Sequence, residues 1–185
     1  MSDSFGTWQL DALVAVGGLG EIWRATRDGL SEAVALKRMH THLLRNDEAR
    51  DQFTREQELA TTLPPHRNVV HGHEIGTVLE RPYLAMELVP GGDLRRQLMS
   101  DPRGGDKPAR LDKQRVLDIV CAACDAASHL HANGWVHGDI NPSNLVVDGD
   151  RTVLIDLGIA RALDEAGTPQ DTHAYMAPEQ VRDEA

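Results

Sequence analysis

Two short polar segments in the last third of the chain carry the residue types that phosphate chemistry needs. They are 137–144, which reads His-Gly-Asp-Ile-Asn-Pro-Ser-Asn, and 156–158, which reads Asp-Leu-Gly. Asn144 and Asp156 offer hard oxygen ligands of the kind that magnesium on a nucleotide requires. Asp139 lies five residues before Asn144, so it can face the hydroxyl of a nucleophile while Asn144 reaches the metal. The other interpretation is that both segments are ordinary polar turns beside strands.

A second set of residues suited to phosphate lies near the N-terminus. Gly17, Gly18 and Gly20 lie between two predicted strands, where absent side chains let backbone N–H groups approach phosphate oxygens. Lys37 ends a strand of buried type and is one of only three lysines, which favours a phosphate-binding ammonium. Glu56, at the centre of the next predicted helix, is the natural carboxylate to hold that ammonium in place. Glycine-rich hairpins are common and a lone helical glutamate is usually solvated, so neither feature decides alone.

The elements that would position the N-terminal residues form a small antiparallel sheet with a covering helix. The predicted strands are 8–15, 21–26, 33–39, 71–78 and 82–89. The predicted helix runs from the capping residue Asn46 to about Leu63 and carries Phe53, Leu59 and Ala60 at helical spacing. The segment 90–92, Pro-Gly-Gly, then has the composition of a hinge.

The rest of the chain is predicted to be mostly helical around one hairpin. Helices are expected at 93–99 and 112–132, with a Pro- and Gly-rich loop between them and Gly134 placed to end the second. Short strands at 145–147 and 153–155 are joined by a tight turn. The fold class expected for the whole chain is therefore α+β.

Taken together, these residues resemble the Hanks-type serine/threonine protein kinases, most closely their bacterial members, from about Trp8 to Gln180. The resemblance implies a bilobal fold. Residues 1–89 would be the N-lobe, with its sheet, helix C and hinge, and residues 90–185 would be an incomplete C-lobe. It also implies ATP and Mg2+ as cofactors and the Ser or Thr hydroxyl of a protein as the acceptor.

The family pattern can be carried over residue by residue. The glycine-rich loop Gly-x-Gly-x-x-Gly-x-Val appears at 15–22, with alanine at its first position. The resemblance implies that a Lys37–Glu56 ion pair orients the α- and β-phosphates, that Asp139 is the catalytic base, and that Asn144 and Asp156 bind magnesium. The residues it implies for nucleotide binding are Gly17, Gly18, Gly20, Ile22, Ala35, Lys37, Met86, Glu87, Val89, Asp93 and Val146.

Within that set the resemblance gives Met86 the gatekeeper position, with the backbone at Glu87 and Val89 bonding adenine and Asp93 taking the ribose hydroxyls. His137 would support the catalytic loop by packing beneath it. The segment 177–179, Ala-Pro-Glu, would close an activation segment that contains Thr172.

Three departures from the family pattern change these expectations. Gly138 replaces an arginine that binds a phosphate on the activation loop, so activation by loop phosphorylation is not expected. Asn141 replaces a lysine that neutralises charge on the transferred phosphate, which should raise the barrier by about a few kcal/mol. The chain ends soon after Glu179, so a partner or a missing segment is expected to complete the C-lobe.

Two rival functions remain open on the sequence. Gly138, Asn141 and the missing C-lobe helices motivate the first, a pseudokinase that binds nucleotide and serves as a regulatory scaffold. The order His137, Gly138, Asp139 and then Asn144 is also similar to the loop of aminoglycoside and choline kinases, which phosphorylate small molecules. Against the second alternative stand the glycine-rich loop and the Ala-Pro-Glu segment.

The composition of the chain argues against some classes of binding partner. A net charge of −10 opposes binding to nucleic acid or to an anionic membrane surface, and no stretch is apolar enough for a membrane span. Cys121 and Cys124 are expected to be reduced thiols in a helix core, which predicts a cytoplasmic protein. The i, i+2 histidine pairs beginning at His40, His71 and His129 are expected to be surface residues rather than metal ligands.

Overall fold

The computed structural model describes residues 3–99, 111–159, 161–162 and 175. The chain divides into two compact units. The first comprises Met1–Pro64 and His71–Val89, and the second comprises Pro65–Val70 and Pro90–Ala185. None of the helices in the described part of the chain is long and apolar enough to cross a membrane.

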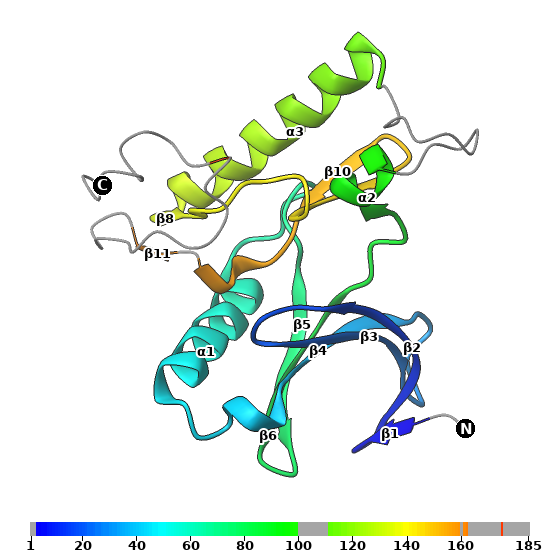
Figure 1. Cartoon of the computed structure of the whole chain (residues 1–185), viewed down its shortest axis with the longest axis vertical. Coiled ribbons are helices and arrows are strands. Elements are labelled where there is room, and N and C mark those ends of the chain that lie inside the picture. The colour runs from blue at the N-terminus through cyan, green and yellow to red at the C-terminus, as the bar shows by residue number, and fades with distance from the viewer. Residues whose placement is uncertain (1–2, 100–110, 160, 163–174, 176–185) are drawn as a thin grey trace. The chain divides into compact units, whose positions relative to one another are not determined.

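A six-stranded antiparallel sheet forms most of the first unit (Figure 1). Its order is β1-β2-β3-β4-β6-β5. The strands are β1 (Asp3–Phe5), β2 (Trp8–Val16), β3 (Gly20–Thr26), β4 (Val34–Met39), β5 (Gly72–Val78) and β6 (Arg81–Glu87). The five strands predicted from the sequence are all present, whereas β1 is an addition that pairs with the start of β2.

One helix, α1 (Asp47–Thr62), follows β4 after a short 3-10 turn, η1 (Thr41–Leu43), that the sequence did not predict. The Asn46 side chain accepts a hydrogen bond from the Ala49 N–H at 2.9 Å, so the predicted cap is present. Phe53, Leu59 and Ala60 are buried, as helical spacing predicts. The apolar face of α1 packs against β5 and β6.

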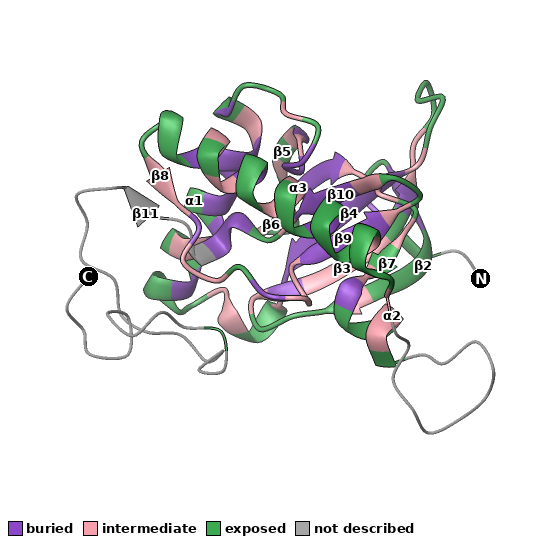
Figure 2. Cartoon of the chain, turned by 90° about the horizontal axis from the view of Figure 1, so that it is seen from above, coloured by how far each residue is buried: buried purple, intermediate pink, exposed green. Residues whose placement is uncertain are grey.

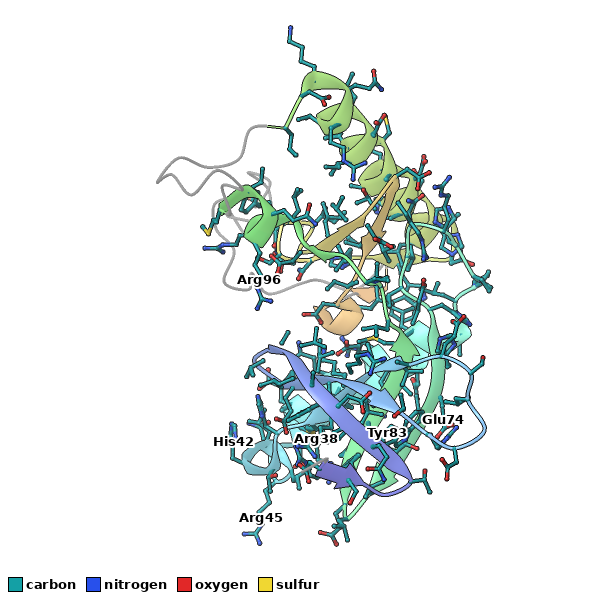
Figure 3. All side chains as sticks on the ribbon, turned by 90° about the vertical axis from the view of Figure 1, so that its right-hand side faces the viewer. Arg38, His42, Arg45, Glu74, Tyr83 and Arg96 are labelled. Atoms are coloured by element: carbon teal, nitrogen blue, oxygen red, sulfur yellow. The ribbon has the colours of Figure 1, made fainter. Side chains whose placement is uncertain are left out.

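Apolar residues cover both faces of the sheet. As a result, β4 is buried along its whole length. One cluster consists of Phe5, Trp8, Leu10, Ala25, Val34, Leu36, Tyr83 and Ala85. The other contains Met39 with Ala49 and Phe53 of α1. Adjacent side chains of a strand point to opposite faces, so Leu36 enters the first cluster while its neighbour Lys37 faces the side of α1. At the edge of the first cluster the Tyr83 hydroxyl donates to Glu74 at 2.6 Å (Figure 3).

The second unit combines two helices with two small sheets. Its elements are β7 (Gly92–Asp93), α2 (Leu94–Met99), α3 (Lys113–Ala132), β8 (Trp135–Val136), β9 (Leu145–Asp148), β10 (Arg151–Leu154), η2 (Leu157–Ile159) and β11 (Arg161–Ala162). The order is β10-β9-β7 in one sheet and β11-β8 in the other. Both helices and the β9–β10 hairpin were predicted, whereas the two-residue strands were not.

Residues 65–70 belong to the second unit because they line the open edge of β10. The Val70 N–H donates to the Leu154 carbonyl at 2.9 Å, and the Leu154 N–H donates to the Asn68 carbonyl at 2.8 Å. The buried Asn68 amide also donates to the Thr152 carbonyl at 2.7 Å. These bonds satisfy backbone groups that an unpaired edge would leave open.

The helix α3 corrects one expectation about the cysteines. Its N-cap is Asp112, the first residue of the predicted helix, whose carboxylate accepts from the Arg115 N–H, and the helix buries Ile119, Ala126 and Leu130. Cys121 and Cys124 are exposed rather than in the core. Figure 2 shows that much of the surface of α3 is exposed.

Candidate functional site

The glycine-rich loop lies at the turn between β2 and β3. Val16 pairs with Glu21 across the hairpin, and the Gly17 N–H donates to the Gly20 carbonyl at 2.8 Å. A Cβ on Gly20 would lie 2.3 Å from the Arg38 carbonyl oxygen, so only glycine fits against β4 at this point. A Cβ on Gly18 would meet nothing within 4 Å. The loop is therefore tight at Gly20 and open at Gly18.

Four predicted nucleotide-binding side chains share one face of the sheet. Ile22 pairs with Lys37 across β3 and β4, and Ala35 pairs with Met86 across β4 and β6. Since Ala35 and Lys37 are two residues apart on β4, all four side chains point to the same face. This is an apolar surface with one ammonium group at its end.

Lys37 and Glu56 form a buried ion pair. The Lys37 Nζ lies 2.5 Å from Oε1 and 2.6 Å from Oε2 of Glu56. The two side chains are only 7% and 4% exposed. Buried charges are stable in a protein only when they are paired and hydrogen-bonded, so α1 and β4 are locked to each other at this point.

The remaining predicted nucleotide-binding residues are Glu87 and Val89 in the first unit and Asp93 and Val146 in the second. Glu87 ends β6, and its N–H donates to the His71 carbonyl at 2.9 Å, while Val89 is half-buried. The Asp93 carboxylate accepts from the Arg96 N–H at 2.8 Å, so it caps α2. Asp93 also pairs with the buried Val146 across β7 and β9.

Asp139 and Asn144 are in direct contact in the loop before β9. The Asn144 Nδ2 donates to the Asp139 carbonyl at 2.9 Å and to Asp139 Oδ2 at 3.0 Å. This turns the amide nitrogen toward Asp139 and the amide oxygen of Asn144 away from it. The Ile155 N–H donates to the Asn144 carbonyl at 2.9 Å, which brings the residue before Asp156 beside Asn144.

Asp156 is exposed and has a φ of 62°, the left-handed region in which residues other than glycine are uncommon. Such strain tends to occur at functional sites. Asn144 and Asp156 supply hard oxygen donors, which fits magnesium. No group of three or more His, Cys, Asp or Glu side chains suited to a metal occurs in the described ranges. The pair would therefore need phosphate oxygens and water to complete the coordination of the ion.

His137 contacts the backbone of both polar loops. It is 1% exposed, and its Nδ1 lies 3.3 Å from the Asp139 N–H while Nε2 lies 3.2 Å from the Ile155 carbonyl. A backbone N–H can only donate, so Nδ1 accepts and Nε2 carries the proton. Burial holds the pKa of His137 below its usual value of 6.5, although the Ile155 hydrogen bond and the nearby Asp156 and Asp139 oppose this. The ring is neutral and has the supporting place expected for it.

Asn141 has a role inside the loop. It is 5% exposed, its Oδ1 accepts from the Ser143 N–H at 2.8 Å, and its Nδ2 donates to the Asp139 carbonyl at 3.3 Å. Its carbonyl accepts from the Asn144 N–H at 3.0 Å. This side chain closes an Asx turn of the kind that shapes a loop without adding charge. Gly138 has a φ of 80°, a conformation that glycine adopts without strain.

One residue near the candidate site was missed on the sequence. His40, expected to be a surface histidine, has its Nε2 3.0 Å from the Gly17 carbonyl oxygen. The sequence feature that could have indicated this contact is the position of His40 three residues after Lys37, which brings it beside the β2–β3 hairpin. The predicted activation-segment residues Thr172 and 177–179 lie outside the described residues.

Comparison with known proteins defines the class. The protein kinase domain family matches residues 8–185, so the chain belongs to that family. This confirms the predicted family and the α+β protein-kinase fold.

Individual relatives are bacterial kinases. The serine/threonine-protein kinase PknD of Mycobacterium tuberculosis is 35% identical over 186 residues, covering 97% of this chain and 27% of PknD. PknJ of the same organism is 31% identical, covering 95% of this chain and 30% of PknJ. The crystal structure of the M. tuberculosis PknI kinase domain superposes with a TM-score of 0.71 at 28% identity, covering 98% of this chain and 67% of that domain. The chain thus spans less than a third of the length of these two curated relatives.

Proposed function

We propose that the chain acts as an ATP-dependent serine/threonine protein kinase, which transfers the γ-phosphate of Mg-ATP to a hydroxyl of a protein substrate. The observation that carries the proposal is the buried Lys37–Glu56 pair beside an open glycine-rich loop. Burying two charges is costly, and a hydrophobic pair would often be as stable, so the ion pair suggests a use for the ammonium group. The names of the relatives support the same activity.

Nucleotide binding would use apolar side chains and backbone groups. The apolar face at Ile22, Ala35 and Met86 suits the adenine ring, and the proposal also assigns Val146 to nucleotide binding. Since the Glu87 N–H already donates to His71, its carbonyl is the group to accept from adenine, with the backbone of Val89 beside it. The proposed ribose contact is Asp93.

The phosphates would be held by the glycine-rich loop at Gly17, Gly18 and Gly20, through the backbone N–H groups that the loop leaves unused, and by the Lys37 ammonium. Glu56 keeps that ammonium in place. Asn144 and Asp156 would hold Mg2+ by their side-chain oxygens. When bound, the ion neutralises charge on the β- and γ-phosphates.

Asp139 would accept the proton of the substrate hydroxyl. The hydroxyl oxygen forms a bond to the γ-phosphorus, the bond from that phosphorus to the β,γ-bridging oxygen breaks, and ADP leaves. Asn144 donates to Oδ2 of Asp139, which fixes the orientation of the carboxylate. Because Asn141 is turned into the loop and carries no charge, we expect a transfer rate below that of relatives with a lysine there.

The setting and partners of the chain follow from this proposal. ATP and two exposed reduced thiols suit a cytoplasmic location. The apolar outer face of α3 leaves room for a partner or a further segment of a longer protein to cover it.

The test is transfer of labelled γ-phosphate from Mg-ATP to the chain itself and to a generic basic acceptor protein. The decisive variant is Asp139→Asn, which keeps an oxygen to accept from Asn144 and loses the base. Asp150→Asn, in the exposed β9–β10 turn, is the matched control. Transfer by the wild type and Asp150→Asn but not by Asp139→Asn would support the proposal. If the wild type and both variants bind nucleotide but none of them transfers phosphate, the proposal is overturned in favour of a pseudokinase scaffold.

A further inference from the structure

His40 holds the glycine-rich loop through both its side chain and its backbone. Its Nε2 lies 3.0 Å from the Gly17 carbonyl oxygen, and its N–H donates to the Leu19 carbonyl at 2.9 Å. A carbonyl oxygen only accepts, so Nε2 must carry the proton. One residue directly after β4 therefore fixes two peptide groups of the loop.

The contact with Gly17 controls a donor on the other side of the same peptide. A trans peptide is planar, and its C=O and N–H point in opposite directions. With the Gly17 carbonyl held by His40, the Gly18 N–H must point away from the imidazole. The surroundings of Gly18 are not crowded, because a Cβ on Gly18 would meet nothing within 4 Å.

The Gly18 N–H is also available to a ligand. The Gly17 N–H is already used by the Gly20 carbonyl. Within the described part of the chain, no hydrogen-bond acceptor is recorded for the backbone N–H of Gly18 or Leu19. These two groups are thus loop donors from which phosphate oxygens could accept.

The imidazole is itself held in position. The rings of His40 and His42 stack with centroids 5.2 Å apart and an interplanar angle of 23°. His42 belongs to η1, the turn between β4 and α1. Stacking limits rotation of the His40 ring, so its Nε2 is directed at the loop before any ligand arrives.

We propose that His40 is a positioning residue for nucleotide binding, whose Nε2–H fixes the Gly17–Gly18 peptide so that the Gly18 N–H is presented to a phosphate of the nucleoside triphosphate. The inference rests on the proposed kinase function, because it needs a nucleotide at the loop. It adds a residue three positions after Lys37 on the same chain segment, so the phosphate-binding ammonium and the phosphate-binding loop are positioned by one strand and the residue that follows it.

The test is the Kd of a non-hydrolysable ATP analogue with Mg2+, measured by isothermal titration calorimetry on the chain and its variants. Loss of one hydrogen bond in His40→Ala should weaken binding about five- to tenfold. His40→Gln places an amide N–H where Nε2 was and should bind close to wild type. His40→Asn is too short to reach Gly17 and should behave like His40→Ala. His73→Ala, on the exposed surface of β5, is the matched control and should change nothing.

Two results would overturn the inference, and they differ from failure of the proposed function. If His40→Ala binds as tightly as wild type while its Tm falls, the residue only stabilises the hairpin. If His40→Gln is as weak as His40→Ala, the donor at Nε2 is not what matters. If the wild type binds no nucleotide at all, the proposed function fails first and the inference falls with it.

Discussion

At the scale of single residues, the Lys37–Glu56 pair matters both for the stability of the fold and for the proposed binding of phosphate. A lysine near the end of a continuously buried strand needs a carboxylate, and the only question is which one. The sequence could identify Glu56, because it lies on the buried side of a helix whose spacing and cap were readable. Pairs of this kind are predictable when both partners lie on regular elements.

The first prediction concerns this pair. Glu56→Gln should lower the free energy of unfolding by about 3 kcal/mol, since it leaves a buried ammonium without its counter-charge. Urea denaturation of the chain measures this. Glu58→Gln, on the exposed side of the same helix, is the control and should change stability by less than about 0.5 kcal/mol. Equal effects of the two substitutions would contradict a buried ion pair.

The second prediction concerns pH. The pKa of buried His137 lies below its usual 6.5, so the unfolded chain binds a proton there before the folded chain does. Stability therefore rises with pH in this range, and it is lost as pH falls below about 6.5, by up to roughly 1.4 kcal/mol per unit. Urea denaturation at pH 7 and pH 5 should show this loss.

The variant His137→Asn keeps an acceptor for the Asp139 N–H but cannot titrate, so its stability should depend less on pH than that of the wild type. His131→Asn, at the exposed end of α3, should keep the dependence of the wild type. A His137→Asn variant as sensitive to acid as the wild type would show that His137 is not the group responsible.

His40 shows why other residue roles could not be predicted. Its partner Gly17 lies 23 positions earlier in the chain. The contact depends on how closely the β2–β3 hairpin lies against β4. That distance is short because Gly20 has no Cβ to meet the Arg38 carbonyl, and it can be seen only in the folded structure. The internal bonds of Asn141 were missed for a related reason: its identity suggested a lost lysine, whereas its burial assigns it to the turn.

At the scale of elements, strands and helices with strong local signals were predictable. Asn46 and Asp112 cap α1 and α3 as their residue types suggest, and the main strands lie within a residue or two of the predicted bounds. The short strands β1, β7, β8 and β11 were not predicted. Two or three residues carry no readable periodicity, and each of these strands exists only because a partner strand offers hydrogen bonds.

The turn between β5 and β6 gives the third prediction. Its two central residues, Leu79 and Glu80, have φ values of 48° and 64°, the type I′ conformation that favours Asn-Gly. The double substitution Leu79→Asn with Glu80→Gly should raise the free energy of unfolding by about 1 kcal/mol, because it relieves left-handed strain at both positions. Leu79 is 90% exposed, so little packing is lost.

Thermal or urea unfolding would measure the gain. Leu79→Ala is the matched control: it removes the exposed side chain, keeps the Cβ and should give no such gain. A double variant no more stable than Leu79→Ala would mean that the turn stores no strain.

At the scale of the whole molecule, α3 has an outer side on which large apolar side chains are exposed. Val116, Leu117 and Val120 are 44%, 57% and 52% exposed on the outer side of the helix. Cys121 and Cys124 are exposed as well. Periodicity alone could not separate a helix that is buried all round from one with an apolar outer face, which is why the thiols were predicted to be in the core.

The fourth prediction follows from that face. In the native 185-residue chain both thiols should react with an aromatic disulfide reagent within minutes, with two equivalents released before any denaturant is added. Cys121→Ser and Cys124→Ser should each leave one equivalent. Reaction only after unfolding would show that the outer face of α3 is covered in solution.

We have proposed that the chain binds Mg-ATP with its glycine-rich loop and with its polar segments at 137–144 and 156–158. The most direct measurement is hydrogen–deuterium exchange of the chain with and without a non-hydrolysable ATP analogue and Mg2+. We expect slower exchange in two separate regions, the glycine-rich loop at 17–20 and the polar segments from His137 to Asp156, with both effects reduced in Lys37→Met. Protection in only one of these two regions, or in neither, would contradict the proposal.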